Sequence, residues 1–367
     1  MRRRVRLAVA ATLAVALLLL GYRCAPTLAV SVSLALPATD AALARLSPEP
    51  IRDEVVVVSG GHRIAADLYR LPTVHGGLVL VHGLSRAGRR HPELVRLARL
   101  LARHGRLVLV PQLDGLAAFR LDGAEVDDIR AALDYVGRRT AAVGVAGFSF
   151  GAGPALLAAA SHPGLALAAS FGGYADLRNV ITYVTTGVHM LGGQRYTRHQ
   201  EEYNRWKLLA LLVGFIDSRR DRDVLSTVAG RKLADPASDT SALEAQLGPE
   251  GHAVLRLVVN HEPSAVPALL AELSQPTRDA LAALSPLAAV ARLQSPVLIA
   301  HGVADASIPF TESLRLADAA GARGQLALLQ TFHHTGAQSS WESWSARLTD
   351  AWSVVRLADA LLRFDRR

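Results

Sequence analysis

Residues 141–160 read AAVGVAGFSFGAGPALLAAA, in which an apolar run meets an alanine-rich run at three glycines around Ser149. The first run is typical of a buried strand and the second of a helix. Gly147, Ser149 and Gly151 match the G-x-S-x-G pattern of a tight strand-to-helix turn, in which glycines let the backbone approach itself. Such a turn exposes the serine hydroxyl at a helix N-terminus, where backbone amides favour a developing negative charge. The alternative is a serine that caps the helix after a glycine turn.

The segments on either side of this stretch alternate between two kinds of pattern. Apolar runs typical of strands buried on both faces are followed by runs with helical spacing, up to residue 173. The strand-like runs cover residues 77–83, 106–111, 141–149 and 165–173, and the helical runs cover 91–104, 126–139 and 151–162. A hairpin of two strands, turning at Gly60 and Gly61, precedes them. The alternation predicts the α/β fold class, with a doubly wound, mostly parallel sheet.

A long segment without this rhythm interrupts the pattern. From Tyr174 to Arg292 the sequence is mostly helical, and the alternation resumes at SPVLIAHG, residues 295–302. A helical insertion between two strands of one sheet predicts a cap over one end of it. The predicted organisation is a signal segment (1–30), a linker (31–50), the first part of the core (51–173), the helical cap (174–292) and the second part of the core (293–367).

The N-terminal segment combines clustered arginines with an apolar run from Leu7 to Tyr22. This pattern predicts a signal anchor or a signal peptide that brings the chain to a membrane. We favour an uncleaved transmembrane anchor, because the sequence Thr27-Leu28-Ala29 is only a weak cleavage candidate. Since arginines tend to stay on the cytoplasmic side, we expect the rest of the chain outside the cytoplasm, anchored to a bacterial-type inner membrane or exported. The alternative is a buried N-terminal helix.

Net charge and cysteine content argue against several classes of protein. The chain has 367 residues and a net charge of +8, and five of these charges come from arginines before residue 24. No basic stripe interleaved with aromatic residues follows, so we expect no nucleic-acid binding. Cys24 is the only cysteine, which argues against an internal disulfide or a thiolate zinc site. The histidines of the cap lack the i,i+4 spacing of metal ligands, so we expect no metal and no cofactor.

A serine hydroxyl needs a base to become a nucleophile at neutral pH, and the base needs an acid that orients it. Asp305 follows the predicted strand at 295–302, and loops at that edge of a parallel sheet are where sites are built. Asp305 is therefore our candidate acid, with a turn-forming aspartate as the alternative. Asp176, just after the strand-like run at 165–173, is a reserve candidate.

Two adjacent histidines, His333 and His334, follow the last strand-like run. Neighbouring side chains in an extended segment point in opposite directions, so only one of them can face the serine. We favour His334 as the base because it lies further into the loop, and His333 is the alternative.

These segments, in this order, resemble the α/β-hydrolase fold serine hydrolases, a superfamily of esterases, lipases and peptidases. The resemblance covers Glu54 to about Arg363 apart from the helical insertion, and it rests on VLVHG, GFSFG, HGVAD and the late histidines. It implies that Ser149 is the nucleophile, that Asp305 is the acid and that the base lies in the His333-His334 pair.

The resemblance also implies an oxyanion hole. His82-Gly83 matches the family's HG pair at the end of the third strand, so the backbone amides of Leu84 and Phe150 would be the two donors. Losing one such donor typically lowers the rate by about 10²- to 10³-fold. We expect His82 itself to hydrogen-bond the surrounding loops rather than to act as the base.

Two segments depart from the family pattern. The loop VPQLDGLAAF lacks the common D-x-R-G-H sequence, so Gln112 and Asp114 shape either a different pocket or only a different turn. The cap contains an apolar segment, residues 206–216, which is either a lid helix that meets lipid or acyl chains or a helix buried against the sheet. We favour the buried helix.

The sequence therefore predicts a serine hydrolase that cleaves an ester of a small molecule through an acyl-enzyme, as a carboxylesterase does. One alternative is a peptidase that acts on short peptides, and another is acyl transfer to an acceptor other than water. From a different class, the chain could be a catalytically silent binding protein with this fold. The presence of serine, acid and histidine together favours the enzyme.

Overall fold

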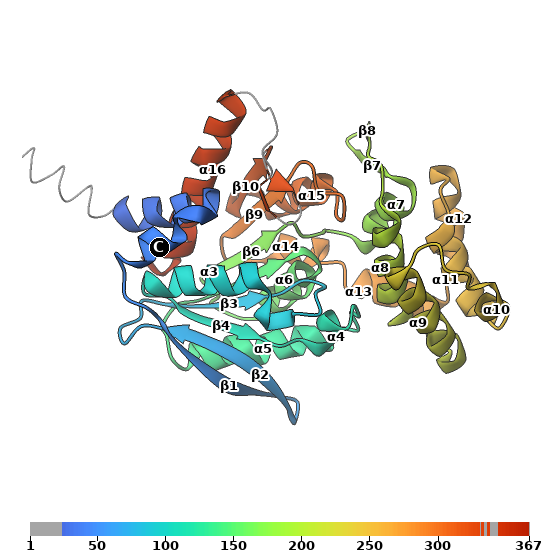
Figure 1. Cartoon of the computed structure of the whole chain (residues 1–367), viewed down its shortest axis with the longest axis horizontal. Coiled ribbons are helices and arrows are strands. Elements are labelled where there is room, and N and C mark those ends of the chain that lie inside the picture. Colours follow the sequence, from blue (N-terminus) through green and yellow to red (C-terminus); the bar gives the residue numbers. More distant parts are fainter. Residues whose placement is uncertain (1–23, 331, 334–335, 338–343, 367) are drawn as a thin grey trace, which may run out of the picture.

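The computed structural model describes residues 24–330, 332–333, 336–337 and 344–366 (Figure 1). An eight-stranded sheet with the order β1-β2-β4-β3-β5-β6-β9-β10 forms the centre of the molecule. Its strands are β1 (Ile51–Ser59), β2 (His62–Arg70), β3 (Gly77–Val81), β4 (Leu107–Pro111), β5 (Val143–Phe148), β6 (Leu167–Phe171), β9 (Val297–Gly302) and β10 (Gly324–Leu329). From β4 to β10 all neighbouring strands are parallel, while β1, β2 and β4 pair in antiparallel fashion. The predicted mostly parallel α/β sheet is confirmed.

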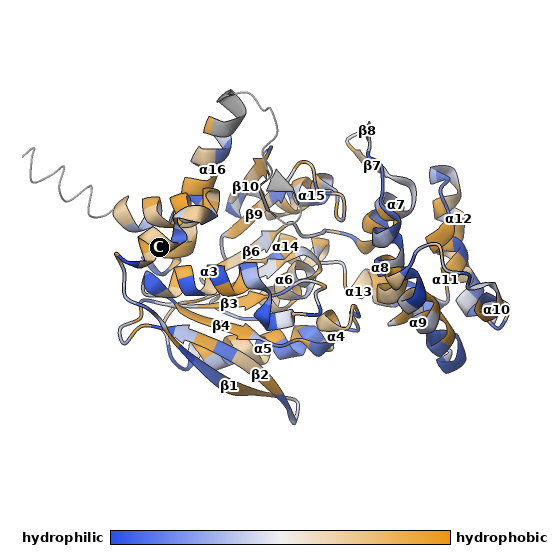
Figure 2. Cartoon of the chain, in the orientation of Figure 1, coloured by the Kyte–Doolittle hydropathy of each residue, from blue (hydrophilic) through white to orange (hydrophobic). Residues whose placement is uncertain are grey.

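Helices cover both faces of this sheet. Successive residues of a strand point to opposite faces, and in β3 Leu78 and Leu80 belong to one apolar cluster while Val79 and Val81 belong to another. The first cluster includes α3 (Pro92–Arg103) and α16 (Trp344–Arg363), and the second includes α5 (Ala124–Gly137), α6 (Ala152–Ala160), α14 (Leu287–Arg292) and α15 (Phe310–Ala320). The short α4 (Asp114–Ala117) follows β4. The apolar colour of β3 and β4 in Figure 2 fits their burial on both faces.

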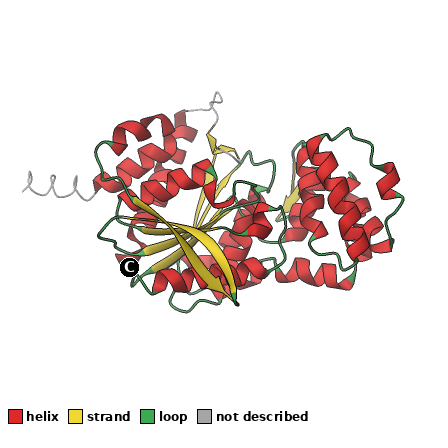
Figure 3. Ribbon diagram, turned by 60° about the horizontal axis from the view of Figure 1, so that its bottom comes forward, coloured by secondary structure: helices red, strands yellow, loops and turns green. Residues whose placement is uncertain are grey.

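The helical insertion lies between β6 and β9. It forms a block at one end of the sheet (Figures 1 and 3). Its elements are α7 (Leu177–Thr186), β7 (Val188–Leu191), β8 (Gln194–Thr197), α8 (Glu202–Val213), α9 (Arg219–Ala234), α10 (Ser241–Glu244), α11 (Pro249–Val259), α12 (Val266–Glu272) and α13 (Gln275–Ala283). The apolar segment 206–216 is buried, and α8 packs against α7, α9 and α11. The predicted burial is confirmed, but the predicted partner was wrong, because other helices of the insertion cover this helix instead of the sheet.

The N-terminal part of the described chain is helical over residues 24–35, where Val30 is fully buried in the cluster of α3 and α16. Residues 31–50, for which the sequence predicts a linker, contain the end of this helix, a 3-10 turn (Pro37–Thr39) and α2 (Asp40–Ala44). None of the helices within the described residues is long and apolar enough to cross a membrane. The predicted anchor, Leu7 to Tyr22, lies outside the described residues and stays a prediction.

Candidate active site

The backbone at Ser149 adopts a conformation that L-amino acids avoid. Its φ is 51°, and among the described non-glycine residues only Phe119 shares a positive φ. Ser149 directly follows β5 and opens a 3-10 turn (Ser149–Gly151) that leads into α6. A non-glycine residue in the left-handed region costs about 1–3 kcal/mol, and such residues cluster at functional sites. The tight turn predicted from the sequence is therefore present, with its strain at the serine.

Both glycines of this turn are required by close approaches of the backbone. A Cβ atom on Gly147 would overlap the Cα atom of Ala152, and one on Gly151 would overlap the carbonyl oxygen of His82. The start of α6 thus lies directly against the end of β3. Since no side chain fits at either position, glycine at 147 and 151 is what allows the turn to form.

The predicted oxyanion-hole segment lies beside the serine. A Cβ atom built on Gly83 would be 2.9 Å from the Cβ atom of Ser149 and 3.4 Å from its Oγ atom. Leu84 follows Gly83 directly, and Phe150 follows Ser149, so both predicted donors belong to residues next to this contact. Their role as donors stays a prediction.

His82 has a bonding role in these loops. Its side chain is buried, the backbone amide of Leu113 donates to its Nε2 atom (3.1 Å), and its Nδ1 atom lies 2.8 Å from the carbonyl oxygen of Gly83. Because Nε2 accepts a hydrogen bond, the ring proton belongs on Nδ1, which donates to Gly83. Burial lowers the pKa of His82, which favours this neutral ring. The expected structural role of His82 is confirmed.

Asp305 lies in the loop after β9 and is only 3% exposed. Its Oδ1 atom accepts hydrogen bonds from the backbone amides of Ser307 (2.7 Å) and Ile308 (3.0 Å). Its Oδ2 atom is 3.5 Å from Nε2 of His301 and faces Gly172. One carboxylate oxygen therefore shapes the turn, as the alternative interpretation expects, while the second oxygen points toward the end of β6.

The order of the strands brings the ends of β5 and β9 to one edge of the sheet. Both strands pair in parallel with β6, which lies between them, and Phe148, Phe171 and Ala300 are in register. Because parallel strands are about 4.8 Å apart, the ends carrying Ser149 and Asp305 are about 10 Å apart. This carboxyl edge is where α/β sheets hold their sites.

The two candidate bases fall at the limit of the described residues. After β10, the short strand β11 (Phe332–His333) pairs with β12 (Gly336–Ala337) and lies beside β9. The backbone of His333 is thus at the carboxyl edge, but nothing is described of its side chain. His334 lies outside the described residues, so the choice of base stays a prediction.

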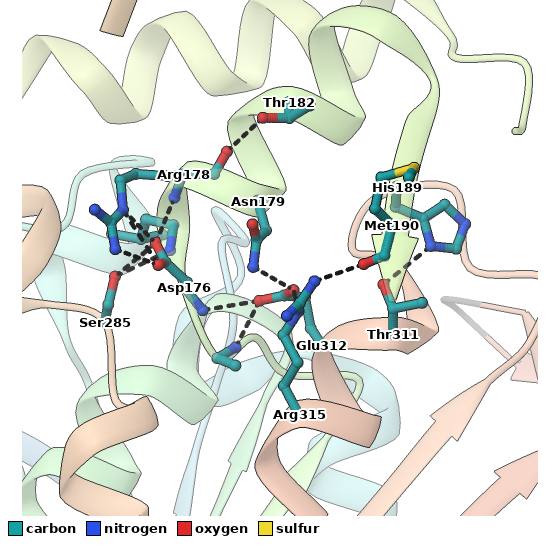
Figure 4. Close-up of polar contacts among 12 residues, drawn as sticks. Asp176, Arg178, Asn179, Thr182, His189, Met190, Ser285, Thr311, Glu312 and Arg315 are labelled. Carbon is teal, nitrogen blue, oxygen red and sulfur yellow. Dashed lines mark hydrogen bonds and ion pairs between the residues drawn. The ribbon is translucent and has the colours of Figure 1, made fainter. Parts of the chain in front are cut away.

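The reserve acid, Asp176, has another role. Its carboxylate caps the N-terminus of α7 by accepting from the backbone amide of Arg178 (2.9 Å), and it forms an ion pair with that residue's side chain at 2.6 Å (Figure 4). The loop of residues 110–119, whose sequence departs from the family pattern, is held by hydrogen bonds. Gln112 accepts from the backbone amide of Arg89 (3.1 Å) and donates to Asp114 (3.1 Å). These bonds support the simpler interpretation, that Gln112 and Asp114 shape a turn.

Sequence reasoning missed the residue that joins the insertion to the core. Glu312 of α15 is fully buried, and its carboxylate accepts from the backbone amides of Ala175 (3.0 Å) and Asp176 (2.8 Å) and from the side chain of Asn179 (2.9 Å) (Figure 4). Burial raises the pKa of Glu312. These partners are more than 130 positions away in the sequence, and no local pattern signals such a contact.

The acid loop has two further contacts with the insertion. The hydroxyl of Tyr183 donates to the carbonyl oxygen of Asp305 (2.7 Å), and the side-chain amide of Asn204 donates to the carbonyl oxygen of Ala306 (3.0 Å). The insertion therefore contacts the loop that carries the candidate acid.

Among the residues that the structure describes, no three His, Cys, Asp or Glu side chains are arranged to hold a metal ion.

The model of the X-Pro dipeptidyl-peptidase (S15) family matches residues 119–335, which is more than half of the chain and includes both the turn at Ser149 and the loop of Asp305. The chain belongs to this family. No curated protein matches this S15-family chain.

Solved structures similar to the S15-family chain share its fold. The α/β hydrolase GrgF from Penicillium sp. sh18 is 15% identical with a TM-score of 0.51, and the alignment covers 85% of this chain and 98% of GrgF. An acylaminoacyl peptidase in complex with Z-Gly-Gly-Phe-chloromethyl ketone is 13% identical with a TM-score of 0.51. The alignment covers 89% of this chain but 43% of that peptidase, so the chain spans less than half of its length. Family and fold together establish an α/β-hydrolase fold serine hydrolase, as the sequence resemblance implies.

Proposed function

We propose that this serine hydrolase cleaves the acyl bond of a small molecule through an acyl-enzyme formed on Ser149. The observation that carries the proposal is the strained backbone of Ser149 in a turn closed by glycines, against Gly83 and at the same sheet edge as Asp305. Maintaining a positive φ at a serine costs stability, which a purely structural turn would avoid with glycine.

The proposed reaction has two steps. The Oγ atom of Ser149 attacks the carbonyl carbon and its proton passes to the base, which is His334 or, as the alternative, His333. The base then gives this proton to the leaving group, and the backbone amides of Leu84 and Phe150 stabilise the oxyanion. Water, activated by the same histidine, releases the acyl group, while Asp305 orients the histidine and stabilises its positive charge.

Two kinds of scissile bond are candidates. Hydrolysis of a carboxylic ester is the activity that the sequence predicts. Cleavage of short peptides is the second candidate, and the match to the X-Pro dipeptidyl-peptidase family specifically favours it. Both use the same acyl-enzyme, and they differ in whether the leaving group is an alcohol or an amine.

A substrate panel tests the proposal. p-Nitrophenyl esters of increasing acyl length and aminoacyl-amide substrates, including X-Pro amides, would be compared with the wild-type protein and the Ser149→Ala variant. We expect turnover of at least one series by the wild type and none above background by the variant. Equal rates for both proteins, or no turnover by a folded wild type, would favour the silent binding protein.

The location of the enzyme is a separate proposal, which rests on the N-terminal sequence. We propose that residues 1–30 hold the chain at a bacterial-type inner membrane with its catalytic part outside the cytoplasm. Cell fractionation with protease treatment of spheroplasts tests this: the catalytic part should be digested from outside. Full protection in intact spheroplasts would contradict it.

A further inference from the structure

One lysine of the insertion lies near the loop of the candidate acid. In the first turn of α8, Asn204 donates to the carbonyl oxygen of Ala306 (3.0 Å) and its Oδ1 atom is 3.4 Å from the hydroxyl of Ser307. Lys207 comes three residues later in the same helix. Residues three apart share a helix face, so Lys207 extends from the face that contacts the acid loop.

The surroundings of Lys207 give its ammonium few partners. Its Nζ atom lies over the aromatic ring of Tyr203, 5.6 Å from the ring centroid. Within the described residues, Lys207 makes no hydrogen bond or ion pair. Burial lowers the pKa of Lys207, and the negative charge of Asp305 partly opposes this shift. The side chain of Lys207 is partly buried, and the carboxylate of Asp305 is close enough to attract its ammonium.

Two other cations of the insertion are treated differently. The guanidinium of Arg205 donates to the backbone carbonyl groups of Thr185 (3.0 Å) and Asn260 (3.1 Å). The ammonium of Lys232 donates to the carbonyl oxygen of Pro236 (3.2 Å) and lies over the ring of Trp206. Partial removal of a cation from water without an acceptor is unfavourable, and a bound anion would offset this cost at Lys207.

The position of Lys207 indicates which part of a substrate it would meet. In the proposed reaction the histidine stands between Ser149 and Asp305 and donates its proton to the leaving group. The leaving group therefore lies on the acid's side of the serine, which is the side of Lys207.

We propose that Lys207 binds a carboxylate carried by the leaving group, so that the preferred substrates are short peptides or esters whose departing part ends in a free carboxylate. The inference deepens the proposed function and rests on it. An ammonium–carboxylate hydrogen bond fixes the departing part near the histidine, and its effect belongs mainly in KM, because the same contact is present before and during bond cleavage.

Matched substrate pairs test this specificity. 4-Carboxyphenyl acetate would be compared with the neutral 4-carbamoylphenyl acetate, and the tripeptide Ala-Pro-Phe with its C-terminal amide. We expect the wild type to favour the carboxylate of the cleaved pair by about 10- to 100-fold in kcat/KM, a range typical of a hydrogen bond to a charged group. The Lys207→Met variant should lose this preference through KM, and Lys207→Arg should keep most of it.

Lys232→Met is the matched control, because Lys207 and Lys232 are the only lysines of the chain. This variant should keep the wild-type preference. An equal rate for both members of a pair in the wild type, or a preference that survives Lys207→Met, would overturn the inference. Turnover of 4-carbamoylphenyl acetate that Lys207→Met leaves unchanged would show that the proposed function itself stands.

A second readout does not depend on turnover. Acetic anhydride acetylates both lysines, and mass spectrometry measures each rate separately. The tripeptide acid should slow acetylation of Lys207 but not of Lys232, and the tripeptide amide should slow neither. Protection of Lys207 without any turnover would support the binding site while contradicting the proposed function. Equal effects of acid and amide would contradict the binding site.

Discussion

The two ends of the parallel strands, called here the carboxyl edge and the amino edge of the sheet, differ in their most prominent feature. At the carboxyl edge, the backbone of Ser149 has a φ of 51° and Gly83 lies directly against it. At the amino edge, just before β3 and β4, an open cavity of about 1520 Å³ lies between α2, α3, α16 and the helix of residues 24–35. Its lining includes none of the predicted catalytic residues. This cavity and the strained backbone of Ser149 are thus at opposite edges.

Lys207 differs in its pairing from two cations at the amino edge. At the amino edge, Arg96 forms an ion pair with Asp40 (3.2 Å) and Arg106 one with Asp365 (2.7 Å). At the carboxyl edge, Lys207 has no such partner among the described residues. The volume of a cavity alone therefore does not locate the candidate active site. The strained backbone of Ser149 and the contact of α8 with the loop of Asp305 lie instead at the carboxyl edge.

The largest expected effect is on activity at the carboxyl edge. Ser149→Ala should lower kcat by at least about a thousandfold, because the nucleophile is lost. Ser149→Gly should be equally inactive but more stable than Ser149→Ala by about 1 kcal/mol, since glycine relieves the positive φ. Steady-state kinetics and urea unfolding measure both effects. Equal stability of the two variants would remove the argument from strain.

The acid loop should show the second largest effect. Asp305→Asn keeps an acceptor for the backbone amides of Ser307 and Ile308 but loses the negative charge. We expect kcat to fall by about 10²- to 10⁴-fold, with little change in melting temperature. If Asp305 only forms the turn, kcat would stay near the wild-type value.

A third prediction concerns the close packing at the elbow. Gly151→Ala should destabilise the fold by at least about 2 kcal/mol, because its Cβ atom would overlap the His82 carbonyl oxygen. Gly230→Ala is the matched control: apart from its own helix backbone and chain neighbours, nothing lies within 4 Å of a Cβ atom built there, and its position inside α9 predicts a gain of up to about 1 kcal/mol. Urea unfolding compares the two, and similar destabilisation of both would contradict the account.

The stability of the contact between the insertion and the core should depend on pH. Burial, aided by the positive charge of Arg198, lowers the pKa of His189 from 6.5 to about 4, and this ring hydrogen-bonds the hydroxyl of Thr311 (2.9 Å). A lowered histidine pKa stabilises the folded state above pH 6.5, and this contribution is lost as the pH falls toward 4.

His189→Gln should therefore show a smaller fall in melting temperature between pH 6.5 and 4 than the wild type. Thermal melts across this range measure the difference. His82 and His104, whose pKa values burial also lowers, would contribute the fall that remains in the variant. Parallel pH profiles for both proteins would show that His189 does not titrate as the structure indicates.

The smallest effect is expected at the amino edge. Arg99 lines the cavity, is about half exposed and pairs with Glu49. Because an exposed ion pair contributes up to about 1 kcal/mol, Arg99→Ala should change stability by no more than that and activity by less than about twofold. A large loss of activity in this variant would show that the amino edge contributes to function.

Local patterns predicted the core well. The apolar runs at β3, β4 and β5 are strands buried on both faces, and glycines at 147 and 151 define the turn at Ser149. These features depend on residues a few positions apart, which a sequence displays directly. Asp305 could be found because it follows a recognisable buried strand.

Contacts between distant segments could not be predicted. Glu312 meets residues near position 175, and Asn204 meets the loop of Asp305, only because the insertion folds back onto the core. The helical state of residues 24–35 depends on packing of Val30 against α3 and α16, which lie far along the chain. The spacing of apolar residues within a helix does not reveal which distant segment that helix packs against. The choice between His333 and His334 also stays a prediction.

Labelling with a fluorophosphonate reports whether Ser149 is an activated nucleophile, because the reagent reacts with such a serine whatever the substrate is. We expect one label per molecule on the wild-type protein, located at Ser149 by peptide mass spectrometry, and none on Ser149→Ala. A folded wild-type protein that stays unlabelled, or equal labelling of the two proteins, would contradict the claim that the carboxyl edge holds the active site.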